Sequence, residues 1–268
     1  MAVHTHYLVE LCAGAGMLGT AVKLALDDRV RTVGYVERET GAAATLVARM
    51  ADATLDQAPI WDDITTAADG EFAEYVQQCA PLIVCGGYPC TPWSVAGKQR
   101  GVHDPRHLWP YIDAFIGVTK PECVFFENVG AHLRLGFGAV RRDLERRGYR
   151  VACGLFSAAE VGANHRRERL FILGLADPDL DGARAQVGRP DRGESVAGTG
   201  EELPFFALGP NDPRWRDAYP QPAVCRPPDG VGRRVVESSL SITGNGVVTL
   251  AAAYAFVSLA ATIIGGES

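Results

Sequence analysis

The stretch Tyr7-Leu-Val-Glu-Leu-Cys-Ala-Gly-Ala-Gly-Met17 decides the fold class of this 268-residue chain. Residues 7–12 are mostly apolar and predict a strand, residues 13–16 predict a tight glycine turn, and residues 17–26 have the apolar spacing of a helix. A strand, a glycine turn and a helix in this order open a nucleotide-binding α/β unit. The turn carries only two of the three glycines of the full pattern, so the fold class depends on the rest of the chain as well.

The rest of the chain alternates predicted strands with predicted helices. A second strand at 30–36 ends in Glu37, the position at which such units usually hold the two hydroxyls of a ribose; a surface glutamate at a strand end is the alternative. Further strands are predicted at 60–64, 81–85, 122–126, 149–156 and 169–175, and further helices at 42–50, 72–79, 108–118 and 140–147. This alternation predicts an α/β fold with a Rossmann-like, doubly wound and mostly parallel sheet.

The composition changes in the last third of the chain. Nine of the sixteen prolines lie between residues 177 and 230, where long apolar runs are few. Residues 177–235 therefore predict a small irregular insertion. Residues 1–176 and 236–268 then make up the main α/β domain.

An apolar run that ends at Ile264 follows the insertion and is nearly long enough to cross a bilayer. Thr249, Ser258 and Thr262 interrupt this run, and no basic residue anchors either end. The run therefore predicts a buried helix of the main domain.

The bulk composition is that of a folded protein with reduced thiols. Hydrophobic residues make up 47% of the chain, which is enough for a sizeable core. Seven cysteines, an odd number without a Cys-x-x-Cys pair, indicate free thiols rather than disulfides or a zinc site. His4 and His6 precede the first strand without the basic and apolar regions of a signal peptide. We therefore expect a cytoplasmic protein with no membrane span and no metal.

Charge is distributed unevenly along the chain. The net charge is −6, and residues 27–74 carry 11 acids against 4 arginines, whereas residues 134–170 carry 9 arginines against 4 acids. One face of an acidic protein could therefore bind a polyanion. Only three of the 26 basic residues are lysine. This arginine bias suits phosphate or base contacts, and a GC-rich genome is the plainer explanation.

A second stretch, Cys85-Gly-Gly-Tyr-Pro-Cys-Thr-Pro-Trp-Ser-Val-Ala-Gly-Lys-Gln-Arg-Gly101, carries the chemistry. The strand at 81–85 leads into two glycines, a Pro-Cys pair and a loop with cationic residues. The thiol of Cys90 at this strand end is a candidate nucleophile. A buried structural cysteine is the alternative, and Pro89, Pro92 and the nearby glycines argue against it.

Five stretches, in order, resemble the DNA (cytosine-5) methyltransferase family. They are the glycine turn Glu10-Leu-Cys-Ala-Gly-Ala-Gly16, the loop at 87–101, Phe126-Glu-Asn-Val129, the Arg-x-Arg stretch at 161–171, and Gly244-Asn-Gly-Val-Val248. Together they cover nearly all of the α/β part. The resemblance implies a class I methyltransferase that depends on S-adenosylmethionine and acts on carbon 5 of cytosine.

The resemblance also implies the catalytic roles. The thiolate of Cys90 would add to carbon 6 of the ring, because carbon 5 is a poor nucleophile until this addition makes the ring an enamine. Glu127 would donate a proton to ring nitrogen 3, and Asn128 would position the base of the DNA. Arg169 would bind the exocyclic oxygen, and Arg167 would help to hold the ring or the surroundings of the nucleophile. For the two arginines, the solvated start of a basic strand is the alternative.

The implied cofactor is S-adenosylmethionine. The glycine turn would approach its methionine part, Glu37 its ribose hydroxyls, and Asp63 its adenine amino group, with Asp62 as the alternative to Asp63. The cofactor-binding residues that the resemblance implies are Cys12, Gly14, Ala15, Gly16, Met17, Glu37, Asp63, Pro89, Leu108, Asn245 and Val247.

The implied substrate is double-stranded DNA. A cytosine inside a duplex cannot present carbon 6 to Cys90, so the base would be flipped out at a cost of roughly a few kcal/mol. Ser94, Lys98 and Arg100 would contact the DNA phosphates. Residues 177–235 take the place of the family's target-recognition region. We expect a standalone bacterial or phage enzyme, of the restriction–modification kind, that acts as a monomer on DNA.

Some residues depart from the family pattern. Cys12 stands where many members carry phenylalanine, and Gly246 replaces a serine or alanine; both changes would enlarge the cofactor pocket. Three alternatives stay open: transfer of a larger group from a modified sulfonium cofactor, an RNA-directed enzyme, and a regulator that binds DNA without catalysis. Intact Cys90, Glu127 and Arg169 argue against the last of these.

Overall fold

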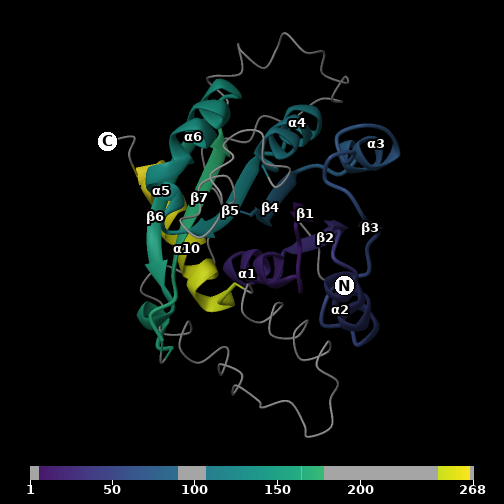
Figure 1. The fold of residues 1–268 in the computed structure, drawn as a ribbon, viewed down its shortest axis with the longest axis horizontal. Helices are drawn as coiled ribbons and strands as arrows, with labels where there is room; N and C mark the ends of the chain where they lie inside the picture. The colour runs from purple at the N-terminus through teal and green to yellow at the C-terminus, as the bar shows by residue number, and fades with distance from the viewer. Residues whose placement is uncertain (1–5, 90–106, 164, 178–246, 266–268) are drawn as a thin grey trace, which may run out of the picture.

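The computed structural model describes residues 6–89, 107–163, 165–177 and 247–265. Within them, seven strands form one sheet in the order β3-β2-β1-β4-β5-β7-β6, with helices on both faces (Figure 1). The strands are β1 (His6–Leu11), β2 (Val30–Val36), β3 (Ile60–Trp61), β4 (Leu82–Gly87), β5 (Cys123–Val129), β6 (Tyr149–Ser157) and β7 (Glu168–Ala176).

Neighbouring strands in this sheet are parallel except where they pair with β7. Strand β7 lies between β5 and β6 and runs antiparallel to both. Strands β1 and β4 are parallel neighbours at the centre, although two strands separate them in the sequence. The strand order therefore reverses between them, and open α/β sheets bind ligands at the carboxyl ends of the strands beside such a reversal. The predicted Rossmann-like, doubly wound and mostly parallel sheet is confirmed.

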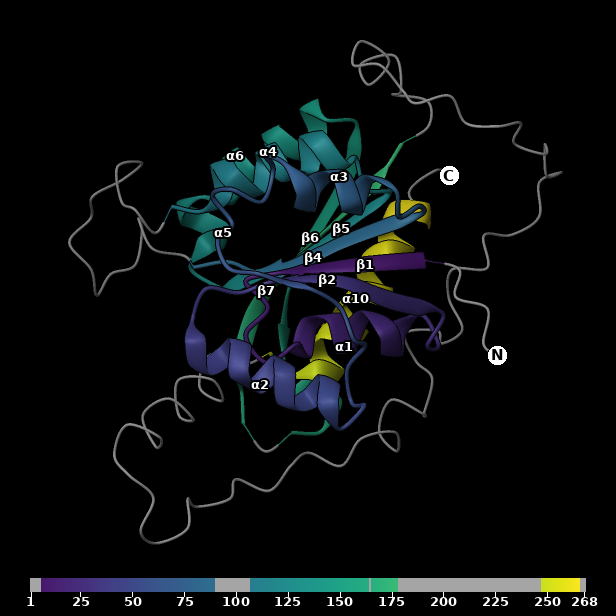
Figure 2. The same ribbon diagram turned by 90° about the vertical axis from the view of Figure 1, so that its right-hand side faces the viewer.

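The helices form two layers, one on each face of the sheet (Figure 2). Helices α1, α2 and α10 lie on one face, and α3, α4, α5 and α6 lie on the other. Their bounds are α1 (Met17–Ala25), α2 (Thr40–Ala51), α3 (Glu71–Gln77), α4 (Trp109–Thr119), α5 (His132–Leu135), α6 (Phe137–Arg146) and α10 (Thr249–Gly265), with a short 3-10 helix, η2, at Ala158–Val161.

Helix α10 is the buried helix that the late apolar run predicts. Its alanines at 251–253 are buried, and small side chains allow it to pack closely beside α1 and across β6 and β7. The ring of Phe256 meets Phe125 of β5 edge to face, with centroids 5.1 Å apart. Among the described residues, no helix is both long and apolar enough to cross a membrane. The helix instead completes the core on the α1 face of the sheet.

The glycines at the end of β4 allow the central strands to approach one another closely. A Cβ atom on Gly86 would lie 2.5 Å from the backbone oxygen of Leu11 in β1. Since real Cβ atoms do not come that close, any other residue here would push β4 away from β1. Strand β4 therefore extends beyond the predicted end at residue 85, through Gly87.

The predicted elements differ from the observed ones mainly at their ends. Strand β3 has two residues rather than five, because the Asp63 carboxylate accepts a hydrogen bond from the Thr65 N–H at 2.9 Å and turns the chain. Helices α5 and η2 were not predicted, since a single turn of four residues shows no repeat of apolar positions. The predicted insertion at 177–235 lies almost entirely outside the described residues, and its boundaries stay predictions.

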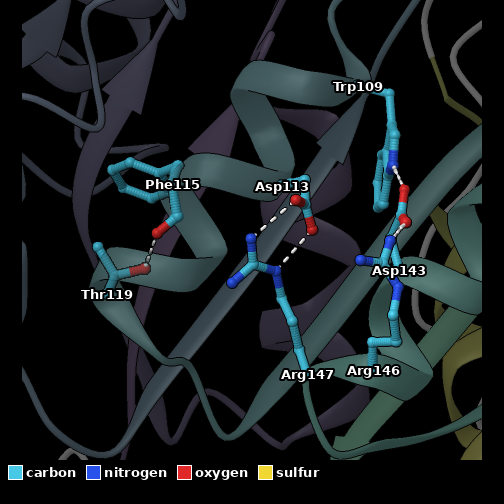
Figure 3. A network of polar contacts seen from close by, with 7 residues as sticks. All are labelled: Trp109, Asp113, Phe115, Thr119, Asp143, Arg146 and Arg147. Atoms are coloured by element: carbon cyan, nitrogen blue, oxygen red, sulfur yellow. Dashed lines mark hydrogen bonds and ion pairs between the residues drawn. The ribbon is translucent and has the colours of Figure 1, made fainter. Parts of the chain in front are cut away.

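A polar network joins α4 to α6 on the second face (Figure 3). The Arg147 guanidinium donates two hydrogen bonds to the Asp113 carboxylate, one from Nε to Oδ1 at 2.6 Å and one from Nη2 to Oδ2 at 2.7 Å. The Trp109 indole donates to Asp143 Oδ2 at 2.8 Å, and Arg146 pairs with the other oxygen of Asp143. Two parallel hydrogen bonds between a guanidinium and a carboxylate are stronger and more directional than a single surface ion pair.

We expect the Asp113–Arg147 pair to stabilise the fold measurably. A double-mutant cycle with Asp113→Ala and Arg147→Ala should give a coupling of about 1 kcal/mol in the free energy of unfolding, measured in urea. The matched control is the exposed Arg141–Glu145 pair of α6, with side chains 55% and 44% exposed, which should couple by less than about 0.5 kcal/mol. Equal coupling in the two cycles would show that the two-bond geometry contributes nothing.

Candidate active site

The glycine turn connects β1 to α1 at the carboxyl edge of the sheet. Its backbone is left-handed at Cys12, Gly14 and Gly16, with φ of 50°, 57° and 76°. A Cβ on Gly16 would lie 2.7 Å from Leu55, whereas nothing lies within 4 Å of the Cβ position of Gly14. The turn is therefore packed on the Gly16 side and open beside Gly14.

Glu37 fixes the turn to the end of β2. Its Oε2 accepts the Gly14 N–H at 2.7 Å, and its Oε1 accepts the Glu39 N–H at 2.7 Å. Each carboxylate oxygen can accept a second hydrogen bond, so the group retains capacity for a ligand hydroxyl. A ribose contact for this acid stays a prediction, and the structure adds backbone partners that the sequence does not reveal.

Arg49 of α2 is a second support of the turn that sequence reasoning missed. Its guanidinium donates to the Ala15 carbonyl and lies 3.3 Å from the Met17 sulfur. Nothing in the local sequence signals this role, because Arg49 sits near the end of α2, far from the turn along the chain.

Glu10 is a buried carboxyl beneath the turn. It is 2% exposed, and its Oε1 accepts the Leu18 N–H at the start of α1 at 3.1 Å. Burial raises the pKa of this carboxyl to about 7, against the hydrogen bonds from the Gly19 and Leu18 backbone, which lower it. The sequence signal for such a role is an acid inside an otherwise apolar strand, and no role of its own was predicted for Glu10.

Four other predicted cofactor residues are described by the structure: Cys12, Asp63, Leu108 and Val247. Burial, followed by the charge of Glu37, raises the pKa of the Cys12 thiol to about 12, so this cysteine stays protonated. The hydrogen bonds from Thr65 lower the pKa of Asp63, so its carboxylate is an ionised acceptor. Leu108 caps the start of α4, and Val247 packs against the core of the α1 face.

Glu127 and Arg169 form an ion pair at the carboxyl end of β5. The Arg169 Nε lies 2.9 Å from Glu127 Oε1, and the Glu127 residue is 8% exposed. Burial raises the pKa of Glu127, opposed by the charges of Arg169 and Arg167. Burial and the like charge of Arg169 lower the pKa of Arg167. The structure therefore brings these three predicted residues together around one buried carboxyl.

The end of β4 lies directly beside this carboxyl. Gly87 is the register partner of Glu127, and a Cβ on Gly87 would lie 3.2 Å from Glu127 Oε2. The amide of Asn128 is 2% exposed and donates to the Tyr88 carbonyl at 3.0 Å. Asn128 thus holds the backbone that leads to residue 90, and its predicted contact with a base is untested.

Several predicted residues lie outside the described part of the chain. They are the nucleophile Cys90, the DNA contacts Ser94, Lys98 and Arg100, and the cofactor residue Asn245. Pro89 is the last described residue before this gap and is exposed. The five cysteines that the structure describes are free thiols, and no group of three or more His, Cys, Asp or Glu in the described ranges could hold a metal ion.

The model of the C-5 cytosine-specific DNA methylase family matches residues 7–187. The chain belongs to this family.

Individual relatives agree with this assignment but are longer. The Type II methyltransferase M.AplI of Arthrospira platensis is 34% identical over 171 residues, which is 62% of this chain and 44% of that protein. M.NaeI of Lentzea aerocolonigenes is 29% identical over 217 residues, or 76% and 50% of the two chains. The chain therefore spans half or less of the length of these relatives.

Solved structures show the same fold. The S. pombe Dnmt2 methyltransferase matches with a TM-score of 0.52 and 20% identity, over 64% of this chain and 51% of that chain. A DNMT2 mutant of Spodoptera frugiperda matches with a TM-score of 0.51 and 17% identity, over 65% and 51% of the two chains. At this identity the likeness concerns the fold alone.

The raised pKa of Glu10 predicts a pH-dependent stability. At a pH between 4.5, the ordinary pKa of a glutamate, and about 7, Glu10 keeps its proton in the folded state and has lost it in the unfolded state. The stabilisation is therefore complete below about pH 4.5 and is lost as the pH rises through about 7, for a total of about 3 kcal/mol. Glu10→Gln cannot ionise, so its free energy of unfolding should fall less between pH 5 and pH 8 in urea titrations.

The matched control is Glu74→Gln on the exposed side of α3, which should keep the wild-type pH dependence. If Glu10→Gln and the wild type lost the same stability over this range, Glu10 would titrate at its ordinary value, contrary to its burial.

Proposed function

We propose that the protein transfers a methyl group from S-adenosylmethionine to carbon 5 of a flipped-out cytosine in duplex DNA, through a covalent adduct on Cys90. The observation that carries this proposal is the buried Glu127–Arg169 pair, which lies beside Gly87 at the end of β4. Gly87 precedes Cys90 by three residues in the sequence. Membership of the family supports the reaction type.

The glycine turn fits the methionine end of the cofactor. The open space beside Gly14 and the carboxylate of Glu37 form a cradle that a larger residue at position 14 would fill. Asp63 offers an ionised acceptor near the end of β3 for an amino group. When bound, S-adenosylmethionine supplies a methyl group on a positively charged sulfur, which an electron-rich carbon can attack.

The chain's own residues would make the cytosine ring electron-rich. The Cys90 thiolate forms a bond to carbon 6 as the carbon 5–carbon 6 double bond breaks. Its electrons form a carbon 4–carbon 5 double bond, and those of the carbon 4–nitrogen 3 double bond move to nitrogen 3, which takes a proton. Glu127 is suited to donate this proton, because burial raises its pKa above the usual range of a carboxyl group. After carbon 5 takes the methyl group, a base removes the carbon 5 proton, the Cys90 sulfur leaves as a thiolate, and nitrogen 3 returns its proton to Glu127, which restores the ring.

The arginines would hold the base during these steps. Arg169 already binds Glu127 through Nε, so the same guanidinium can orient the acid and reach the exocyclic oxygen. Arg167 adds positive charge next to the carboxyl, and the pair offsets the negative charge that Glu127 acquires after proton transfer. Duplex DNA is the proposed substrate, read by a monomer, and residues 177–235 are the proposed recognition region.

Covalent trapping tests the proposal. DNA in which every cytosine is replaced by 5-fluorocytosine removes the need to know the target sequence, because fluorine at carbon 5 cannot leave as a proton would. With S-adenosylmethionine the protein should form a stable protein–DNA adduct, visible on a denaturing gel, and Cys90→Ser should form none. Binding of DNA and cofactor without an adduct would contradict the proposal and favour a non-catalytic regulator.

The same assay separates the enzyme alternatives. Mass spectrometry of ordinary treated DNA should show cytosine heavier by one CH₂ group, whereas a larger gain would identify a modified sulfonium cofactor. Methyl incorporation into duplex DNA should exceed that into tRNA, and the reverse would identify an RNA-directed enzyme.

Glu127→Gln should separate catalysis from binding. Loss of the proton donor should slow adduct formation by about 100-fold. The affinities for DNA and for S-adenosylmethionine should stay within about twofold of the wild type, because the amide keeps the size of the carboxyl. The exposed Glu74→Gln is the control and should react at the wild-type rate. A Glu127→Gln protein that forms the adduct normally would remove Glu127 from the chemistry.

A further inference from the structure

Four buried aromatic rings tie together the two ends of the 90–106 segment. We call Tyr88, Trp109, Phe126 and His132 the root cluster. The Tyr88 ring lies 5.6 Å from Trp109, 5.9 Å from Phe126 and 5.6 Å from His132, measured between centroids. Trp109 and Phe126 meet edge to face at 5.7 Å. Tyr88 therefore contacts the first residue of α4, although residues 90–106 separate them in the sequence.

A hydrogen bond inside the cluster fixes the Tyr88 ring. Its hydroxyl lies 2.9 Å from Nε2 of His132, the first residue of α5, and both residues are 5% exposed. Burial, helped by the charge of His107, lowers the pKa of His132 to about 4, so the imidazole is neutral at neutral pH. A buried hydroxyl without a hydrogen-bond partner costs free energy. The Tyr88 hydroxyl can therefore be buried here because His132 supplies a polar ring atom, which an apolar ring could not do.

Trp109 anchors the other end of the segment. Its side chain is 5% exposed, and its Nε1 donates to Asp143 of α6 at 2.8 Å (Figure 3). Asp143 is itself held by Arg146. The point at which the chain re-enters the fold is therefore attached to a neighbouring helix and, through Tyr88, to the point at which the chain leaves it.

The cluster is also attached to the proposed acid. Phe126 and Asn128 flank Glu127 in β5: the Phe126 ring packs on Tyr88, and the Asn128 amide holds the Tyr88 carbonyl at 3.0 Å. Covalent geometry places the Cα of Cys90 within about 7.6 Å of the Cα of Tyr88, since it is two residues away. A displacement of Tyr88 would therefore shift the backbone that leads to residue 90 relative to Glu127.

We propose that the root cluster, through the Tyr88–His132 hydrogen bond and the Tyr88–Trp109 contact, positions the backbone that carries Cys90 for attack on the cytosine ring. Tyr88, Trp109 and His132 are then positioning residues, and this inference rests on the function proposed above. A sulfur that adds to carbon 6 while Glu127 serves nitrogen 3 must be placed accurately, because an error of about 1 Å can cost about 100-fold in rate.

The test compares adduct formation with binding in variants of the full chain. The substrate is DNA fully substituted with 5-fluorocytosine, at saturating DNA and S-adenosylmethionine. Tyr88→Phe removes only the hydroxyl, and His132→Leu removes its partner; each should slow the adduct by about tenfold. His132→Gln can place a polar amide near the position of Nε2 and should recover much of the rate. The exposed Tyr75→Phe, with a tyrosine 41% exposed on α3, is the matched control and should react normally.

Two further results should accompany the slower rate. The affinities for DNA and cofactor should change by less than about twofold, because the cluster touches neither in the proposal. The double variant Tyr88→Phe, His132→Leu should be no slower than either single variant, because both lose the same hydrogen bond. Urea unfolding of each variant checks that it is folded. If His132→Leu does not fold, the two single variants Tyr88→Phe and His132→Gln decide the question.

Wild-type rates in Tyr88→Phe and His132→Leu would overturn the inference, and so would a loss confined to DNA affinity. A wild type that forms no adduct would instead contradict the proposed function. A DNA-free readout then still decides the inference: alkylation of Cys90 by iodoacetamide, followed by peptide mass spectrometry. Tyr88→Phe should change the rate at Cys90 by about threefold or more and leave the rate at Cys79 unchanged. An unchanged rate at Cys90 would overturn the inference independently.

Discussion

The close approach of β4 to both of its neighbours is the constraint on which the rest of the structure depends. Gly86 leaves room for the backbone of Leu11 in β1, and Gly87 leaves room for the Glu127 carboxyl in β5. The first contact joins β4 to the strand that carries the glycine turn, and the second joins it to the strand that carries the acid. A side chain at Gly86 would push β4 away from β1, and one at Gly87 would crowd the Glu127 carboxyl. Both glycines matter because β4 is the only strand between β1 and β5 in the sheet that the structure describes.

The two buried acids at this edge are stabilised in different ways. Glu10 lies among backbone N–H groups at the start of α1, which oppose the effect of burial only partly. Glu127 lies against the guanidinium of Arg169, which brings a full charge. Backbone dipoles keep Glu10 fixed in one place under the turn. The guanidinium holds Glu127 in position, and in the proposed reaction Glu127 must stay in place while it gives up a proton.

The sequence predicted what depends on local pattern and missed what depends on contacts between distant residues. The strands, the glycine turn and the late buried helix follow from periodicity and turn residues, and their order implies the sheet. Glu127, Arg167 and Arg169 were named from motifs, and the structure brings them together. The roles of Arg49 and Glu10 and the Tyr88–His132 bond could not be read from the sequence, because each joins elements whose neighbourhood only the folded sheet creates. The role of Cys90, the cofactor contacts and the recognition region stay predictions.

Helix α10 has a consequence for the order in which the protein folds. Its buried face covers α1, β6 and β7, yet it comes after all of them in the sequence, beyond the 178–246 stretch. During synthesis, α10 can therefore pack on the apolar surface of α1 only after residues 249–265 have left the ribosome. A nascent chain that stops before this point would leave exposed the apolar residues that α10 covers, and exposed apolar surface of this kind favours aggregation.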